Sequence, residues 1–142
     1  MSQPPPKPSP AGAAPSRRVL LLAHTGRVEA REVARAICAA LVLEGIGVRL
    51  LAHEAVELEL DTASVPLLES TESPDDAGHG CELAIVIGGD GTILRAAEIT
   101  HRSGTPLLGV NLGHVGFLAE AEEEELAATI AAVVRREYQT ED

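Results

Sequence analysis

From Val19 onwards, apolar and polar residues follow two arrangements, and each predicts a different element. Short, mainly apolar runs of four or five residues are typical of strands that are covered on both faces, as in a parallel sheet. Between them, apolar residues recur every three or four positions, which predicts amphipathic helices. The predicted strands span residues 19–23, 48–51, 83–87 and 107–110.

Three helices are predicted between and after these strands. The first carries Val33, Ile37 and Leu41 at helical spacing and should end at Gly45. The second should span Ile93–His101, and the last Ala121–Arg136. In the second helix, one side is expected to carry Ile93, Ala96, Ala97 and Thr100. The alternation predicts an open doubly wound (Rossmann-like) α/β fold, a parallel sheet with helices on both faces.

Two stretches are less clearly patterned. In Glu54–Asp61, apolar residues alternate with acidic ones, which favours a strand, although a short helix remains open. Residues 62–80 contain Pro66, Pro74, Gly78 and Gly80, and we expect mainly loop there. The first 16 residues contain six prolines among small polar residues, so residues 1–17 are expected to form a disordered Pro-rich tail before a domain at 18–142.

Composition and charge exclude several classes of function. The chain has 11 basic and 22 acidic residues, a formal net charge of −11, which argues against binding to nucleic acid or to an anionic membrane. One Phe, one Tyr and no Trp leave almost no aromatic surface for stacking bases. The two cysteines, Cys38 and Cys81, fit no metal or redox spacing, so a reducing cytoplasm is the expected location.

The strongest chemical signal is the run Gly88–Thr92, GGDGT, between a predicted buried strand and a predicted helix. Ligands of such sheets bind outside the carboxyl ends of the strands. Glycines there allow close backbone approach, and exposed amides at a helix N-terminus suit a phosphate. The run is neither GxGxxG nor a Walker motif, and it places a carboxylate, Asp90, among the glycines.

That carboxylate has two possible functions and one structural alternative. Asp90 could bind a divalent metal ion, or accept a proton from a hydroxyl that attacks a γ-phosphate. Alternatively, it could serve only as the N-cap of the following helix, although Thr92 could cap in its place. We favour catalysis over capping.

The same residues carry a resemblance to a known family. GGDGT at 88–92 followed by LGHVGFL at 112–118 resembles the ATP-dependent NAD kinase family, from about Val19 to the chain end. Diacylglycerol and sphingosine kinases share a similar GGDGT turn, but the second motif separates NAD kinases from them. The resemblance implies phosphorylation of the 2′-hydroxyl of the adenosine ribose of NAD with ATP, giving NADP.

The resemblance also implies roles for individual residues. Asp90 matches the catalytic proton acceptor. The nucleotide-binding positions are Gly88, Gly89, Asp90, Gly91, Thr92, Arg95 and Phe117. The structural alternative for Arg95 is a solvated helix arginine, and for Phe117 it is a core residue. No residue is assigned as a metal ligand, and the cofactor implied is a divalent ion, Mg²⁺, that arrives with ATP. Polyphosphate could replace ATP, and the full-length form is expected to be a homo-oligomer.

One feature of the family is missing. NAD kinases continue into a second, mostly β domain that supplies an Asn-Glu pair, whereas Asn111 is the only Asn of this sequence and precedes Leu112. We therefore expect residues 18–142 to be the N-terminal α/β nucleotide-binding domain of a NAD kinase, inactive in isolation. The alternatives are a non-catalytic nucleotide-binding module and a lipid kinase of the GGDGT type. Outside the motifs, Arg27, Arg31 and Arg35 form a stripe that we expect to face solvent, with a phosphate contact from Arg27 as a lesser possibility.

Overall fold

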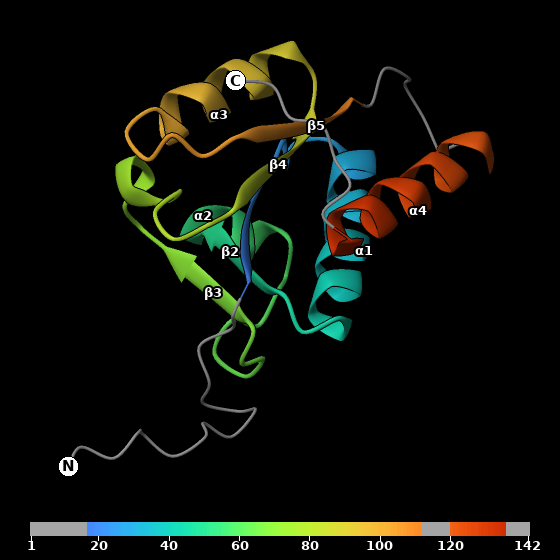
Figure 1. The fold of residues 1–142 in the computed structure, drawn as a ribbon, viewed down its shortest axis with the longest axis horizontal. Helices are drawn as coiled ribbons and strands as arrows, with labels where there is room; N and C mark the ends of the chain where they lie inside the picture. Colours follow the sequence, from blue (N-terminus) through green and yellow to red (C-terminus); the bar gives the residue numbers. More distant parts are fainter. Residues whose placement is uncertain (1–16, 112–119, 136–142) are drawn as a thin grey trace.

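The computed structural model describes residues 17–111 and 120–135, and their strands form one parallel sheet (Figure 1). The strand order is β3-β2-β1-β4-β5. The order in which successive strands are added to the sheet reverses beside β1: β2 and β3 lie on one side of this strand, and β4 and β5 lie on the other. The strands are β1 (Arg18–Ala23), β2 (Gly47–Leu51), β3 (Leu68–Thr71), β4 (Leu83–Gly88) and β5 (Leu107–Asn111).

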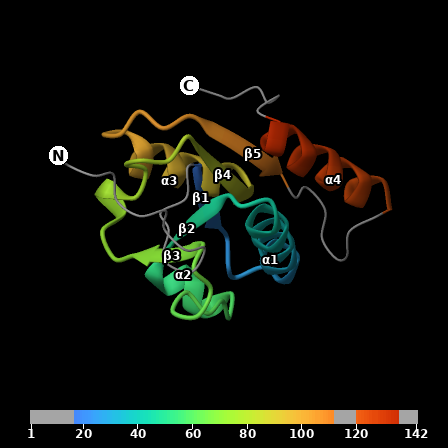
Figure 2. The same cartoon turned by 60° about the horizontal axis from the view of Figure 1, so that its bottom comes forward.

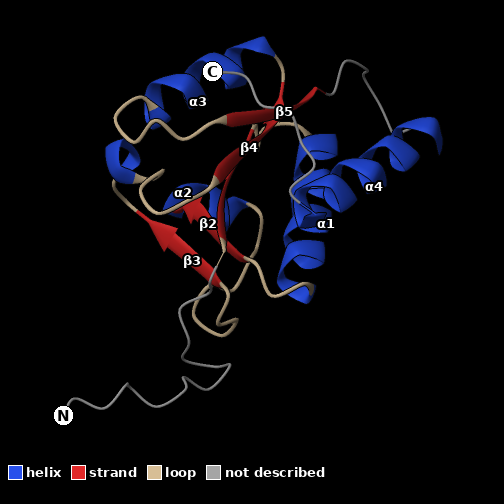
Figure 3. Ribbon diagram, viewed as in Figure 1, coloured by secondary structure: helices blue, strands red, loops and turns tan. Residues whose placement is uncertain are grey.

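Helices cover both faces of this sheet, which confirms the predicted doubly wound fold (Figure 2). Helices α1 and α4 pack against each other on one face, whereas α3 and the short 3₁₀ turn η1 cover the other. Figure 3 shows how strands and helices alternate along the chain. The helical elements are α1 (Val28–Leu43), α2 (Ala52–Glu57), η1 (Pro74–Asp76), α3 (Asp90–Thr100) and α4 (Glu120–Arg135).

The central strands explain the mainly apolar runs of the sequence. In β1, Val19 and Leu21 point into the core beneath α1, and Leu20 and Leu22 point into the core beneath α3. Burial of both faces requires apolar side chains at successive positions. Helix α1 ends at Leu43, two residues before Gly45, the residue predicted to stop it. Gly45 adopts φ +81° and donates its N–H to the Val42 carbonyl at 2.9 Å.

Two segments differ from our expectations. Residues 52–57 form α2, so the strand interpretation of the alternating acidic stretch was wrong and the helical alternative holds. A helix here buries Glu54, Ala55 and Leu58 and leaves Val56 exposed, a spacing that the alternation hid. The segment predicted as mainly loop contains β3, an edge strand paired with β2; only Leu68 of its four residues is buried, so it carried little apolar signal.

Helix α3 also corrects the prediction in detail. It begins at Asp90, three residues before the predicted start, and its buried residues are Ala96, Ile99 and Thr100. Ala97, which we placed on the buried side, is exposed. A small apolar residue such as alanine says little about which face of a helix is buried, whereas the larger Ile99 defines that face.

Candidate functional site

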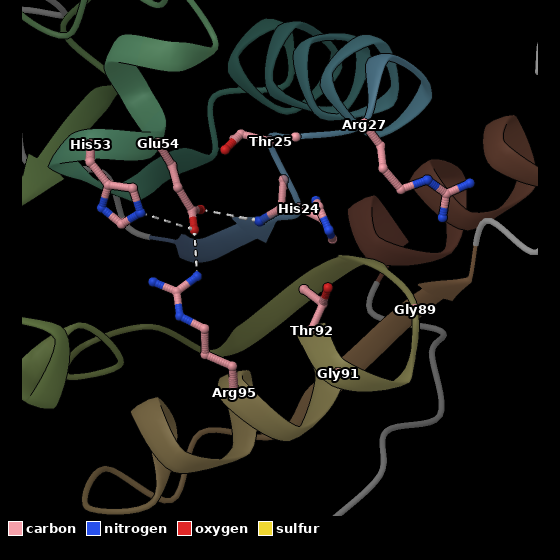
Figure 4. A pocket seen from close by; sticks show the side chains of 11 residues that line it. His24, Thr25, Arg27, His53, Glu54, Gly89, Gly91, Thr92 and Arg95 are labelled. Carbon is pink, nitrogen blue, oxygen red and sulfur yellow. Dashed lines mark hydrogen bonds and ion pairs between the residues drawn. The ribbon is translucent and has the colours of Figure 1, made fainter.

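A cavity of about 620 Å³ opens where the strand order reverses, at the carboxyl ends of β1 and β4 (Figure 4). Open α/β sheets bind their ligands at this position. Three segments line the cavity: the loop after β1, the start of α2, and the turn between β4 and α3. The lining residues are Ala23, His24, Thr25, Gly26, Arg27, His53, Glu54, Gly89, Gly91, Thr92 and Arg95.

The glycines of the β4–α3 turn differ in their surroundings. Gly88 adopts φ +152°, and a Cβ on it would lie 2.5 Å from Thr92 Oγ1 and 3.2 Å from His24 Cβ. The fold itself therefore requires glycine at position 88. A Cβ on Gly89 or Gly91 would meet none of the described residues within 4 Å. These two glycines face open space at the cavity, where a ligand's phosphates could approach the backbone.

Asp90 is the first residue of α3 and is exposed. The N-cap residue is Gly89, and no side chain makes a capping hydrogen bond at this helix start. The alternative in which Asp90 or Thr92 caps the helix is therefore wrong. Thr92 lines the cavity, whereas Asp90 is not among its lining residues.

Arg95 reaches from α3 into the cavity, on the same side as the glycine turn (Figure 4). Its Nη1 donates a hydrogen bond to Glu54 Oε2 at 3.0 Å, and its side chain is 45% exposed. Arg95 is thus partly solvated, as the structural alternative expected, but a specific acidic partner holds it at the cavity.

Glu54 is the site residue that the sequence analysis missed. Its side chain is 1% exposed, and Oε1 accepts the Ala23 N–H at 3.1 Å. Burial raises the pKa of Glu54, and the hydrogen bonds from Ala23 and Arg95 oppose part of that rise. The sequence did contain a signal. Glu54 follows β2 by three residues, so parallel topology brings it to the sheet edge that carries the glycine turn.

The remaining basic residues of the first loop and helix are not a uniform solvated stripe, as we had expected. Arg27 lines the cavity. Arg31 donates to the Thr25 carbonyl at 2.7 Å and Arg35 to the Leu58 carbonyl at 3.3 Å, so both fix neighbouring loops. The 112–118 motif, including Phe117, lies outside the described residues.

Within the described part of the chain, no cluster of three or more His, Cys, Asp or Glu side chains is arranged to hold a metal ion. None of the helices in that part is long and apolar enough to cross a membrane. Cys38 and Cys81 are both free thiols, and burial raises the pKa of Cys38 to about 12.

Comparisons with known proteins agree on one family. The family model described as the ATP-NAD kinase N-terminal domain matches residues 19–138. The chain is 50% identical over 132 residues to a NAD kinase of Thermobifida fusca, covering 93% of this chain and 40% of the relative. It is likewise 50% identical over 126 residues to NAD kinase 2 of Streptomyces coelicolor, covering 89% of this chain and 41% of the relative.

A solved structure shows the same fold. Yeast NADH kinase, crystallised in complex with NADH, superposes with a TM-score of 0.66 at 20% identity, covering 87% of this chain and 37% of that one. This chain therefore spans about 40% of the length of the curated relatives it matches.

Proposed function

Because the chain belongs to the ATP-NAD kinase family, whose N-terminal domain it matches over residues 19–138, we propose that the protein phosphorylates the 2′-hydroxyl of the adenosine ribose of NAD, with ATP as donor. The observation that carries the proposal is the GGDGT turn, which contributes Gly89, Gly91 and Thr92 to the lining of the cavity where the strand order reverses. Since the chain spans about 40% of its relatives, the activity is proposed for the complete protein. This chain would supply the phosphate-binding turn and the proton acceptor.

The turn suits phosphates despite a formal net charge of −11. Gly89 and Gly91 leave the backbone open towards the cavity, and the first amides of a helix lack partners within the helix. These amides and the helix dipole bind an anion without a basic surface. Arg27 and Arg95 add two cationic groups to the same cavity.

Asp90 is proposed as the proton acceptor. The 2′-oxygen of the ribose forms a bond to the γ-phosphorus, the bond to the β–γ bridging oxygen breaks, and ADP leaves. The hydroxyl proton passes to the Asp90 carboxylate. Phosphoryl transfer has a loose transition state in which positioning and charge stabilisation dominate, so a weak base suffices. The exposed carboxylate, which makes no capping bond, supports this role.

The divalent cofactor that the family implies, Mg²⁺, fits a site of this kind. Mg²⁺ is commonly held by one or two carboxylates together with substrate phosphates. Asp90 is an exposed carboxylate beside the phosphate-binding turn, so it could contribute one such oxygen. When bound, the ion would neutralise charge on the phosphates.

The test is Asp90→Asn in the protein expressed from its complete reading frame. We expect NADP formation to fall by a factor on the order of 10² to 10⁴, as for loss of a general base, while the affinity for ATP changes little. Asp75→Asn is the matched control, because Asp75 is an exposed aspartate on η1 away from the cavity. Near-normal turnover of Asp90→Asn would remove Asp90 from the mechanism.

A non-catalytic role for the 142-residue chain alone is favoured by its share of the relatives' length. A coupled NADP assay that compares this chain with the complete protein decides whether the chain alone is catalytic. Turnover by the chain alone contradicts the non-catalytic role. The lipid-kinase alternative is set aside, since the NAD kinase model matches residues 19–138.

The remaining expectations concern the cell and the assembly. We propose a cytoplasmic location, which the two free thiols support, and NAD or NADH as the acceptor. The complete protein is proposed to be a homo-oligomer, which sedimentation would test.

A further inference from the structure

Glu54 lines the cavity and joins three elements through one carboxylate (Figure 4). Oε1 accepts the N–H of Ala23, the last residue of β1, at 3.1 Å. Oε2 accepts Arg95 Nη1 of α3 at 3.0 Å, and Glu54 itself belongs to α2. A single side chain therefore links the end of β1 and two helices at the edge where the ligand is expected.

Burial of this acid needs a reason. A glutamate that is 1% exposed is rare unless it is paired, because the charged form loses its hydration. A paired buried charge is weak support for stability, since desolvation offsets the attraction. Its neighbours Ala55 and Leu58 already supply the apolar contacts of α2 with the core. The geometry thus favours a role in the cavity over a role in packing.

Arg95 shows what that role can be. Its guanidinium carries five N–H donors, and among the described residues its one hydrogen-bond partner is Glu54. The side chain is 45% exposed, so without this contact it would be free to sample solvent-facing rotamers. Ordering such a long side chain when a ligand binds has an entropic cost. The contact with Glu54 keeps the guanidinium at the cavity before a ligand arrives.

We propose that Glu54 is a positioning residue: it fixes Arg95, and through Ala23 the loop that begins at His24, in the geometry that receives a nucleotide phosphate. This inference rests on the proposed function for the identity of the ligand, a nucleotide. It assigns to Glu54 no contact with the reacting atoms.

Electrostatics makes the direction of the effect diagnostic. Among the described residues that line the cavity, Glu54 is the one acidic side chain. The other titratable or charged side chains there are His24, Arg27, His53 and Arg95. Removing its negative charge would, by Coulomb's law alone, strengthen the binding of an anion. In a variant that folds, a loss of affinity on neutralisation therefore indicates lost positioning.

The experiment is a double-mutant cycle of Glu54→Gln and Arg95→Gln in the complete protein, with kcat and KM measured for both NAD and ATP. We expect Glu54→Gln to raise, about ten-fold, the KM of the same substrate whose KM Arg95→Gln raises, with kcat changed less than three-fold. In the Arg95→Gln background, Glu54→Gln should change that KM less than two-fold. Independent, multiplicative effects, or a KM that is unchanged or lowered in Glu54→Gln, would overturn the proposal.

Controls separate positioning from folding and from the proposed function. Glu98→Gln removes the same charge from an exposed site on α3 and should leave both KM values unchanged. Gln keeps an oxygen to accept the Ala23 N–H, and thermal unfolding of each variant checks that it folds. If the complete protein makes no NADP, the proposed function fails, and the same cycle read by calorimetric ATP binding still decides the role of Glu54. A cycle without coupling in an active enzyme refutes the positioning role alone.

Discussion

Gly88 and Gly91 lie three residues apart in one turn, yet the structure gives them different reasons to be glycine. Gly88→Ala should lower the free energy of unfolding by about 2 kcal/mol or more, because φ +152° is strained for alanine and its Cβ would lie 2.5 Å from Thr92 Oγ1. Gly91→Ala should raise it by about 0.5–1 kcal/mol, since Gly91 lies inside α3 with open space around it. Denaturant unfolding of both variants measures the two effects.

Activity should separate the same two variants in a second way. The Gly91→Ala protein, although at least as stable, should lose NADP formation, because the added methyl group occupies the space in which we place a phosphate. If Gly91→Ala is both more stable and fully active, the open space at Gly91 does not receive the ligand.

The raised pKa of Glu54 predicts a pH dependence of the free energy of unfolding, which is measured as the difference between the wild type and Glu54→Gln. Burial raises the pKa of Glu54 in the folded state above its unfolded value of about 4.3. Its contribution to stability is therefore fully present below about pH 4.3 and is lost as the pH rises through the folded pKa, since the unfolded state loses its proton first. Glu54→Gln lacks this loss, so its free energy of unfolding should rise relative to the wild type between pH 4 and pH 7. Parallel curves for the two proteins over this range would contradict the raised pKa.

Three elements at the cavity, β1, β4 and α2, show why the sequence predicts some elements well and others poorly. Strands β1 and β4 are buried on both faces, so their positions could be predicted from apolar runs alone. Helix α2 has six residues, two of them buried. The alternation of apolar and acidic residues over 56–61, which continues past the end of α2, matched the period of a strand. The turn at 88–92 was found because its residue types are rare in this order, whereas Glu54 joins the site only through its tertiary hydrogen bonds to Ala23 of β1 and Arg95 of α3.

Helix α4 is fastened at its C-terminal end by Arg17, a residue that we placed in the Pro-rich tail. Its guanidinium pairs with Glu82 at 2.7 Å and donates to the carbonyls of Val133 and Val134, each at 2.8 Å. These carbonyls belong to the last turn of α4, where the helix itself provides no N–H donors for them. One side chain therefore ties α4 to the amino ends of β1 and β4.

Arg17→Ala should lower the free energy of unfolding by about 2 kcal/mol, because charge-assisted bonds and the pair with Glu82 are lost together. Arg102→Ala, at an exposed position after α3, is the control and should change stability by less than about 0.5 kcal/mol. Hydrogen exchange should show faster amide exchange in α4 of the Arg17 variant. Unchanged exchange there would mean that α4 is held by its apolar contacts with α1 instead.

Net charge and local charge act on an incoming nucleotide in opposite directions. The chain carries a formal charge of −11, which repels an anion at long range, whereas the cavity presents Arg27 and Arg95 at short range. Long-range fields act on the association rate, and close contacts act on the dissociation rate. Added salt screens both, since the Debye length falls from about 10 Å at 0.1 M to about 3 Å at 1 M.

Raising the KCl concentration should therefore increase both rate constants for metal-free ATP binding to the 142-residue chain. Stopped-flow measurements with a fluorescent ATP analogue give the two constants separately, and Arg95→Gln should lose much of the salt dependence of dissociation while keeping that of association. An association rate that falls with salt would show that the basic groups of the cavity, and not the acidity of the chain, govern the approach of the ligand. The acidity of the sequence then acts on how fast a nucleotide arrives, and the cavity residues on how long it stays.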